Sequence, residues 1–252
     1  GRLRDAIATV KEHIALPGVL GRICPAPCEK GCRRGSVDSA VSICLLKRYV
    51  VDADLKSDDP FVPDCRAATG KRVVVVGAGP AGLAAAYSLL KDGHECKVFD
   101  DAENPGGSLQ RDVDEGRLER EVLDAEIDIL RRMGAQFGLA QRVDLSRLDD
   151  LKRECDAVLL ACGEVVPQEI ERLGLEASLH GVHVEVHTFQ TSVPAVFAAG
   201  NAVRPSRMAV HALAEGRRAA VAIDQFLAGG PVAGEGRPWT THIGSLLDSE
   251  VE

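Results

Sequence analysis

Two stretches near the start of the chain repeat apolar residues at helical spacing. Apolar residues from Leu3 to Leu16 follow this spacing, and Pro17-Gly18 ends the predicted helix. Residues 37–52 carry a second helical pattern. Between them, residues 21–36 have Gly and Pro at many positions, which predicts a loop.

A different pattern begins at Lys71. Residues 71–76 are a Val-rich run typical of a buried parallel strand. Small residues at 83–91 predict a helix, and residues 97–99 predict the next strand. Strand, turn, helix and strand together predict a βαβ unit, from which parallel sheets are built.

Further elements follow at similar spacing. Residues 119–133 and 208–227 read as helices, and residues 157–161 and 195–199 as buried strands. The alternation predicts an α/β fold with a Rossmann-like parallel sheet, preceded by a small α-helical domain.

The predicted domains follow from these elements. They are a helical domain at residues 1–56, a polar linker at 57–70, the Rossmann-like domain at 71–230 and a C-terminal tail at 231–252. A length of 252 residues suits one large domain with a small appendage.

The composition of the chain argues against some classes of function. Aromatic residues make up 4% of the chain, so Ala, Val, Leu and Ile must build the core. The formal charge of −8 predicts no broad attraction for nucleic acid or an anionic membrane. The apolar runs are shorter than the ~20 residues of a membrane span, and the first residues do not resemble a signal peptide. We therefore expect a cytoplasmic protein with no nucleic-acid partner and no membrane insertion.

The candidate chemistry begins with a glycine-rich turn, Gly77-Ala78-Gly79-Pro80-Ala81-Gly82, between the first strand and its helix. Gly77 allows the tight turn, Gly79 lets the backbone approach a pyrophosphate, and Gly82 lets the helix pack against the strand. The N-terminus of that helix offers N–H groups to phosphates. A turn without a ligand is the alternative, but the flanking strand and helix favour a dinucleotide.

The second strand ends in Asp100, followed by Asp101. Either carboxylate could accept hydrogen bonds from the adenosine ribose. FAD and NAD both use such a turn, and two later segments favour FAD. Residues 104–109 carry a Gly-Gly pair where backbone would pass the flavin side, and residues 191–201 close the site.

Four of the eight cysteines crowd into one segment, as Cys24, Cys28, Cys32 and Cys44. Four thiolates suit an iron–sulfur cluster or a tetrahedral zinc, although the paired Cys-x2-Cys hooks common in zinc sites are absent. Plain structural cysteines are a third possibility. Disulfides are not expected without an export signal.

The chain resembles the small subunit of glutamate synthase and the matching part of dihydropyrimidine dehydrogenase, from about Gly21 to Leu227. The stretches that carry this resemblance are Gly21–Glu29, Val74–Gly82, Pro105–Gly107, Glu121–Ile127, Thr191–Gly200 and Ala214–Ala220.

The resemblance implies a [4Fe–4S] cluster whose first three ligands are Cys24, Cys28 and Cys32. Related chains often place a Gln or Glu ligand where Lys47 would fall here. Lysine is a poor ligand, so Cys44, one helical turn earlier, is the expected substitute. The family usually has a second cluster with cysteines nearer the N-terminus. No cysteine precedes Cys24, so that cluster is missing or takes ligands from elsewhere.

The resemblance also implies the flavin contacts. Related chains have Gly-Asp where this one has Gly200-Asn201, and that acid touches the ribityl chain. The helix from Met208 would direct its N-terminus at the flavin pyrimidine edge, and Cys162 stands where relatives often carry Thr. The predicted FAD-binding residues are Gly77, Gly79, Pro80, Ala81, Gly82, Asp100, Asp101, Gly107, Leu109, Cys162, Gly163, Gly200, Asn201, Met208 and Ala209.

One expected part is missing. Relatives carry an NADPH-binding domain after the strand that corresponds to residues 157–161. Here only residues 164–180 fill that place, fewer than the about 30 that a βαβ unit needs, and no second glycine turn exists. The sequence therefore predicts an FAD- and [4Fe–4S]-containing electron-transfer subunit of a multisubunit oxidoreductase, active only in a complex.

The expected partners are other redox subunits with iron–sulfur clusters or flavin, or ferredoxin. A self-sufficient NAD(P)H-dependent flavin oxidoreductase is one alternative, and a non-catalytic scaffold stabilised by its cofactors is another. No acid–base constellation stands out, so no catalytic residue is predicted.

Overall fold

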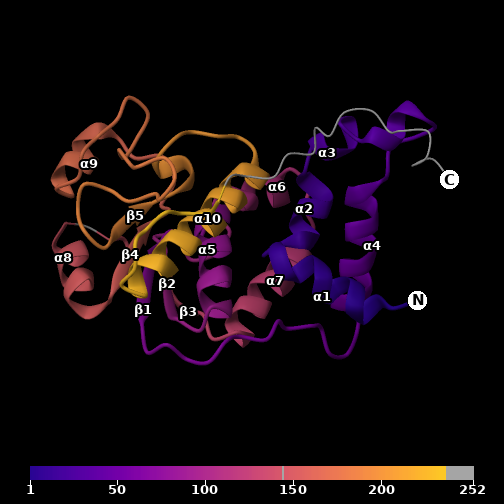
Figure 1. Ribbon diagram of the computed structural model, residues 1–252, viewed down its shortest axis with the longest axis horizontal. Helices are drawn as coiled ribbons and strands as arrows, with labels where there is room; N and C mark the ends of the chain where they lie inside the picture. Colours follow the sequence, from indigo (N-terminus) through magenta and orange to yellow (C-terminus); the bar gives the residue numbers. More distant parts are fainter. Residues whose placement is uncertain (144, 237–252) are drawn as a thin grey trace.

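A computed structural model describes residues 1–143 and 145–236 of the chain. The N-terminal part is helical and lies at one end of the molecule (Figure 1). Its elements are α1 (Leu3–His13), α2 (Pro17–Ile23), α3 (Pro27–Lys30), the 3-10 turn η1 (Arg33–Ser36) and α4 (Ile43–Leu55).

The rest of the chain forms a five-stranded parallel sheet of order β3-β2-β1-β4-β5. The strands are β1 (Arg72–Val76), β2 (Glu95–Phe99), β3 (Gln136–Gly138), β4 (Ala157–Leu160) and β5 (Val196–Ala198). The helices and turns between and after them are α5 (Pro80–Lys91), α6 (Leu109–Asp114), α7 (Arg120–Arg132), α8 (Leu145–Glu154), α9 (Pro167–Arg172), η2 (Gly200–Ala202) and α10 (Ala209–Leu227).

Alternation along β1 divides the core between the two faces of the sheet. Val73 and Val75 pack with α5, α7 and α10, whereas Val74 and Val76 pack with α8 and α9. Both sets are buried, which explains why the strand sequence is uniformly apolar. The observed architecture is the predicted α/β fold (Figure 1).

The N-terminal helices share the first of these two cores. Leu16, Val19 and Leu20 of the α2 region are buried in the same cluster as Leu83 of α5 and Ile127 of α7. The short helix α2 therefore packs against the helices that cover this face of the sheet. The predicted division into separate domains stays a prediction.

The structure differs from the sequence-based elements at several boundaries. One helix was expected to end at Pro17, but Pro17 is the first residue of α2, a position where its missing N–H costs nothing. Helix α4 begins at Ile43 rather than at Val37. Ser and Asp side chains at 38–42 compete with helical hydrogen bonds, as Asp38 does by accepting from the Ser39 N–H.

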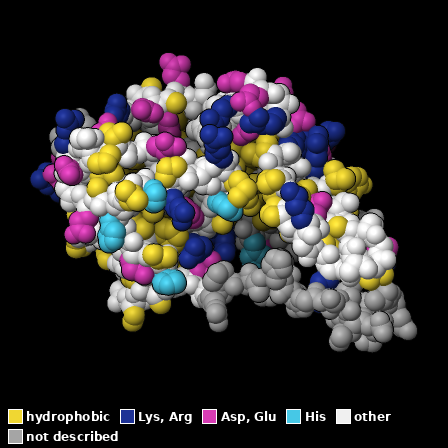
Figure 2. Space-filling model, turned by 90° about the horizontal axis from the view of Figure 1, so that it is seen from above, with side chains coloured by type: hydrophobic (Ala, Val, Ile, Leu, Met, Phe, Trp, Pro, Cys, Tyr) yellow, Lys and Arg dark blue, Asp and Glu magenta, His cyan; other side chains and the backbone are white. Residues whose placement is uncertain are grey.

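The predicted tail at 231–252 lies outside the described residues from 237 onward. Its first part packs on α10, where Gln225 accepts hydrogen bonds from the Ala233 and Gly234 N–H groups. None of the helices in the described ranges combines the length and apolar character needed to cross a membrane. Acidic and basic side chains are intermixed on the face seen in Figure 2.

Candidate cofactor sites

The glycine turn has the close backbone contacts that its sequence predicts. Gly77 has a φ of 111°, and a Cβ there would lie 2.2 Å from the Ala161 carbonyl oxygen. A Cβ on Gly82 would lie 1.9 Å from the Gly77 carbonyl oxygen. Larger residues at either position would therefore displace the turn. Helix geometry leaves the first N–H groups of α5, those of Ala81 and Gly82, available for an anion.

Asp100 anchors this turn from the end of β2. One carboxylate oxygen accepts a 2.6 Å hydrogen bond from the Ala78 N–H, and the other accepts a 2.9 Å bond from the Ala102 N–H. A carboxylate has about four lone-pair positions, so ribose hydroxyls can still donate to it. Asp100 thus has a structural contact beside the ribose role predicted for it.

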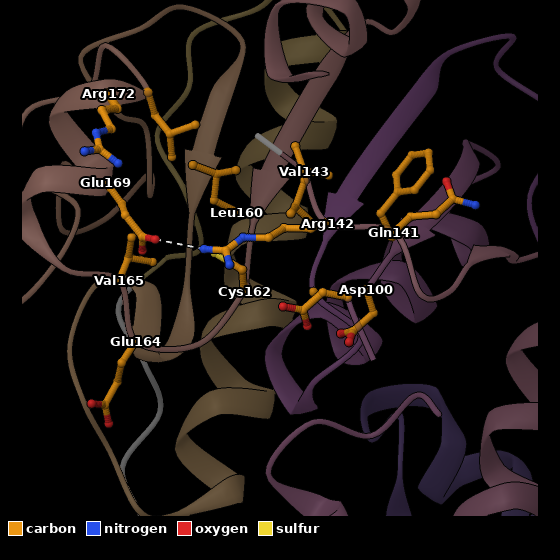
Figure 3. A pocket seen from close by; sticks show the side chains of 15 residues that line it. Asp100, Gln141, Arg142, Val143, Leu160, Cys162, Glu164, Val165, Glu169 and Arg172 are labelled. Carbon is orange, nitrogen blue, oxygen red and sulfur yellow. Dashed lines mark hydrogen bonds and ion pairs between the residues drawn. The ribbon is translucent and has the colours of Figure 1, made fainter. Parts of the chain in front are cut away.

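A cavity of about 710 Å³ opens at the carboxyl ends of β1, β2 and β4 (Figure 3). This end of a parallel sheet is where dinucleotides bind. The predicted residues Gly77, Asp100, Asp101 and Cys162 line the cavity. Other lining residues, none of them among the predicted FAD-binding residues, are Gln141, Arg142, Val143, Glu164, Val165, Glu169 and Arg172.

Arg142 and Glu169 form an ion pair of 2.8 Å across the cavity (Figure 3). Arg142 follows β3, and Glu169 belongs to α9. The side chains are 72% and 41% exposed, so the pair contributes little to stability. The pair connects two residues that line the cavity.

From this cavity the predicted flavin-binding residues continue along the glycine turn. A Cβ on Gly107 would lie 2.8 Å from the Gly79 Cα, and a Cβ on Gly200 would lie 2.8 Å from the Ala81 Cβ. These close approaches bring the segments after β2 and β5 against the start of α5. The predicted flavin-binding segments therefore converge on the start of α5.

Three residues near the predicted flavin site are held by contacts or burial within the protein: Asn201, Leu109 and Glu215. The Asn201 side-chain oxygen accepts a 3.0 Å hydrogen bond from the Ser206 N–H, which holds the loop before α10. Leu109 is wholly buried, so its side chain offers no surface to a ligand in this arrangement. Glu215 accepts a 2.9 Å bond from the Gly200 N–H, and burial raises the pKa of its carboxyl.

Met208 is exposed immediately before α10, and Ala209 is the first residue of that helix. The helix therefore begins at a position open to a ligand, and its N-terminus carries a partial positive charge. Gly163, with a φ of 83°, follows Cys162 at the end of β4.

Cys162 faces the cavity as a protonated thiol. Desolvation, reinforced by the charges of Glu169, Asp101 and Asp100, raises the pKa of Cys162 to about 11. The residue surface is nevertheless accessible in the cavity. A thiol with so high a pKa is a poor nucleophile, so its surroundings do not favour thiolate chemistry.

The four clustered cysteines lie on four short elements. Cys24 is the C-cap of α2, Cys28 belongs to α3, Cys32 precedes η1, and Cys44 belongs to the first turn of α4. All are free and half-buried. Burial, together with the nearby Cys24 thiol, raises the pKa of the Cys44 thiol. The structure therefore brings together the first cysteine and the one expected as fourth ligand.

Glu29 connects the other two cysteines to this pair. It lies next to Cys28 in α3, and its carboxylate accepts a 2.7 Å hydrogen bond from the Cys44 N–H. Hydrogen bonds from the backbone of Val41 and Arg34 lower the pKa of the Cys32 thiol. Such bonds stabilise a thiolate, the form that ligates iron.

No three Cys, His, Asp or Glu side chains in the described ranges are gathered around one metal-ion position. A [4Fe–4S] cluster does not require that arrangement, because each cysteine ligates a different iron. The four thiols come from segments held together by the Glu29 bond to Cys44 and the Arg22 bond to Asp52, and a set of four thiols suits such a group.

The sequence profile of the family described as pyridine nucleotide-disulphide oxidoreductase matches residues 66–216, more than half of the chain. The chain belongs to this family. Residues 1–59 match a second profile, described as dihydropyrimidine dehydrogenase domain II, 4Fe-4S cluster. These matches confirm the predicted fold class, the resemblance and the two predicted cofactors, FAD and a [4Fe–4S] cluster.

Three relatives illustrate the similarity. The chain is 38% identical over 187 residues to the glutamate synthase [NADPH] small chain of Mycobacterium tuberculosis, covering 73% of this chain and 37% of that protein. It is 36% identical over 185 residues to the NADP(+)-dependent formate dehydrogenase subunit beta of Moorella thermoacetica, covering 65% and 26%. It is 36% identical over 166 residues to the NADPH-Fe(3+) oxidoreductase subunit beta of Geobacter sulfurreducens, covering 64% and 25%. In each case the match spans well under half of the relative.

Proposed function

We propose that this chain is an electron-transfer unit of a multisubunit oxidoreductase, with FAD at the glycine turn and a [4Fe–4S] cluster on Cys24, Cys28, Cys32 and Cys44. The observation that carries the proposal is one dinucleotide turn beside a four-cysteine segment, with α2 packed into the core of the sheet layer. When bound, a flavin can exchange one or two electrons and an iron–sulfur cluster exchanges one. In this proposal, residues 1–56 form the domain that binds the cluster and residues 71–230 form the domain that binds FAD. Residues 57–70 are the linker between them.

Different residues of the chain would bind different parts of FAD. The N–H groups of Ala81 and Gly82 would bind the pyrophosphate. Asp100 and Asp101 would accept hydrogen bonds from the ribose in the cavity. The start of α10 would stabilise negative charge on the reduced flavin.

The segment at 164–180 supports exchange with other chains rather than with a nicotinamide. It forms α9 and part of the cavity wall, and the sequence has no second glycine turn. We propose partners that carry iron–sulfur clusters or flavin, ferredoxin among them, in the cytoplasm. The relatives named as small chains or beta subunits support a place within a larger complex.

The test is anaerobic reconstitution of the purified chain, followed by cofactor analysis and reduction. We expect one FAD and about four irons per chain. We also expect NADH and NADPH to leave the flavin absorbance unchanged, while a reduced small iron–sulfur protein bleaches it. Rapid bleaching by NADPH would instead establish the self-sufficient oxidoreductase. A flavin that neither donor reduces would favour the scaffold.

A further inference from the structure

The N-terminus of α2 cannot be capped by its own residues. Pro17 occupies the first helical position and has no N–H, and Leu16 before it has no polar side-chain atom. The Gly18 and Val19 N–H groups therefore need acceptors from elsewhere in the protein. A buried helix end without such acceptors would be strongly unfavourable.

Glu126, on α7, supplies both acceptors. One carboxylate oxygen lies 2.7 Å from the Gly18 nitrogen, and the other lies 2.8 Å from the Val19 nitrogen. The residue is only 1% exposed. Glycine permits this close approach, since a Cβ on Gly18 would lie 3.1 Å from the carboxylate. The contact joins residues 108 positions apart in the sequence.

The other end of α2 presents Cys24. This helix has seven residues, about two turns, and Cys24 is its C-cap. Arg22 ties the same end to Glu119 before α7 and to Asp52 of α4, the latter at 2.8 Å. Helix α4 also carries Cys44. A shift at the capped end of α2 would therefore reach Cys24 through a single short rigid element.

We infer that Glu126 is a positioning residue for the iron–sulfur cluster: from the FAD-binding part of the chain, it caps α2 and so fixes the place of Cys24. This inference rests on the proposed function for the identity of the cluster ligands. It adds that a residue remote from every cysteine in the sequence sets the relation between the flavin and cluster sites.

The experiment compares Glu126→Gln with the matched control Glu121→Gln, an exposed residue on the same helix. Amide hydrogen exchange of residues 18–24 is measured in the full chain before and after reconstitution with iron and sulfide. In Glu126→Gln we expect exchange at Gly18 and Val19 to accelerate by about tenfold or more, since the amide can accept only one of the two bonds. We also expect an altered electron paramagnetic resonance spectrum of the reduced cluster, with FAD absorbance retained.

A second variant covers the case in which Glu126→Gln does not fold. Gly18→Ala places a methyl group against the carboxylate, and it should speed the same exchange even though alanine favours helices. Unchanged exchange in the folded variants would overturn the cap. Faster exchange with an unchanged cluster spectrum would overturn the positioning role. A wild-type chain that binds no iron would refute the proposed ligands instead, while exchange in the iron-free chain would still test the cap.

Discussion

At the scale of single residues, the glycine turn leaves almost no space for a larger side chain. Gly82 faces the Gly77 carbonyl oxygen so closely that a Cβ would lie 1.9 Å from it. We predict that Gly82→Ala loses most bound FAD, because the turn must move away from the phosphates. Flavin absorbance after purification measures this. Gly230→Ala, where a Cβ meets nothing within 4 Å, is the control and should retain the cofactor.

Cys28 tests the cluster separately from the flavin. Cys28 lies in α3, and the FAD cavity is lined by other residues. We predict that Cys28→Ala removes the iron–sulfur signal in electron paramagnetic resonance and leaves FAD absorbance intact. Iron content equal to that of the wild type would refute its assignment as a ligand.

The same scale shows what local sequence can and cannot reveal. Gly77 and Gly82 are recognisable because the turn and its flanking elements are contiguous. Gln141, Arg142 and Glu169 were not predicted, because they reach the cavity only when β3 and α9 are placed beside β2 and β4. Their one available signal was position: residues after a parallel strand gather at its carboxyl edge.

At the scale of elements, long periodic segments such as α7 and α10 were predicted nearly to their ends. β3 has three residues, and α6 and α9 have six each, so their patterns are too short to stand out. The start of α2 was read as a helix end, because Pro and Gly usually interrupt helices. Pro17 suits the first position of a helix, and the distant Glu126 accepts the N–H groups of the two residues that follow it.

Helices α5 and α10 pack at unusually close range. A Cβ on Gly216 of α10 would lie 2.0 Å from the Ala81 carbonyl oxygen of α5. We predict that Gly216→Ala lowers the free energy of unfolding by about 3 kcal/mol through overpacking. Urea denaturation followed by circular dichroism measures the loss. A change no larger than that of Gly230→Ala would contradict this contact.

At the scale of the whole molecule, stability should depend on pH through Glu126. Burial raises the pKa of its carboxyl from 4.5 to about 7, against the opposing effect of its two N–H donors and of Lys11 and Arg22. Between about pH 4.5 and 7 the folded chain keeps a proton that the unfolded chain has lost. The free energy of unfolding should therefore fall as pH rises through this range.

The pH dependence of stability that Glu126 contributes can be isolated by comparing the wild type with a variant that lacks the carboxyl. The full effect of this carboxyl on the free energy of unfolding is on the order of 3 kcal/mol. Glu126→Gln does not titrate, so its stability should vary less between pH 5 and 7 than that of the wild type. Urea denaturation at several pH values measures both chains. Parallel pH profiles would show that the carboxyl does not titrate in this range.

The long separation between Glu126 and Gly18 has a consequence for biosynthesis. Ribosomes make the N-terminus first, so all four clustered cysteines are made before the residue that caps α2. Until α7 is made and folds, α2 has no cap at the end opposite Cys24. The proposed positioning of Cys24 therefore depends on a part of the chain that is synthesised much later than the four cysteines.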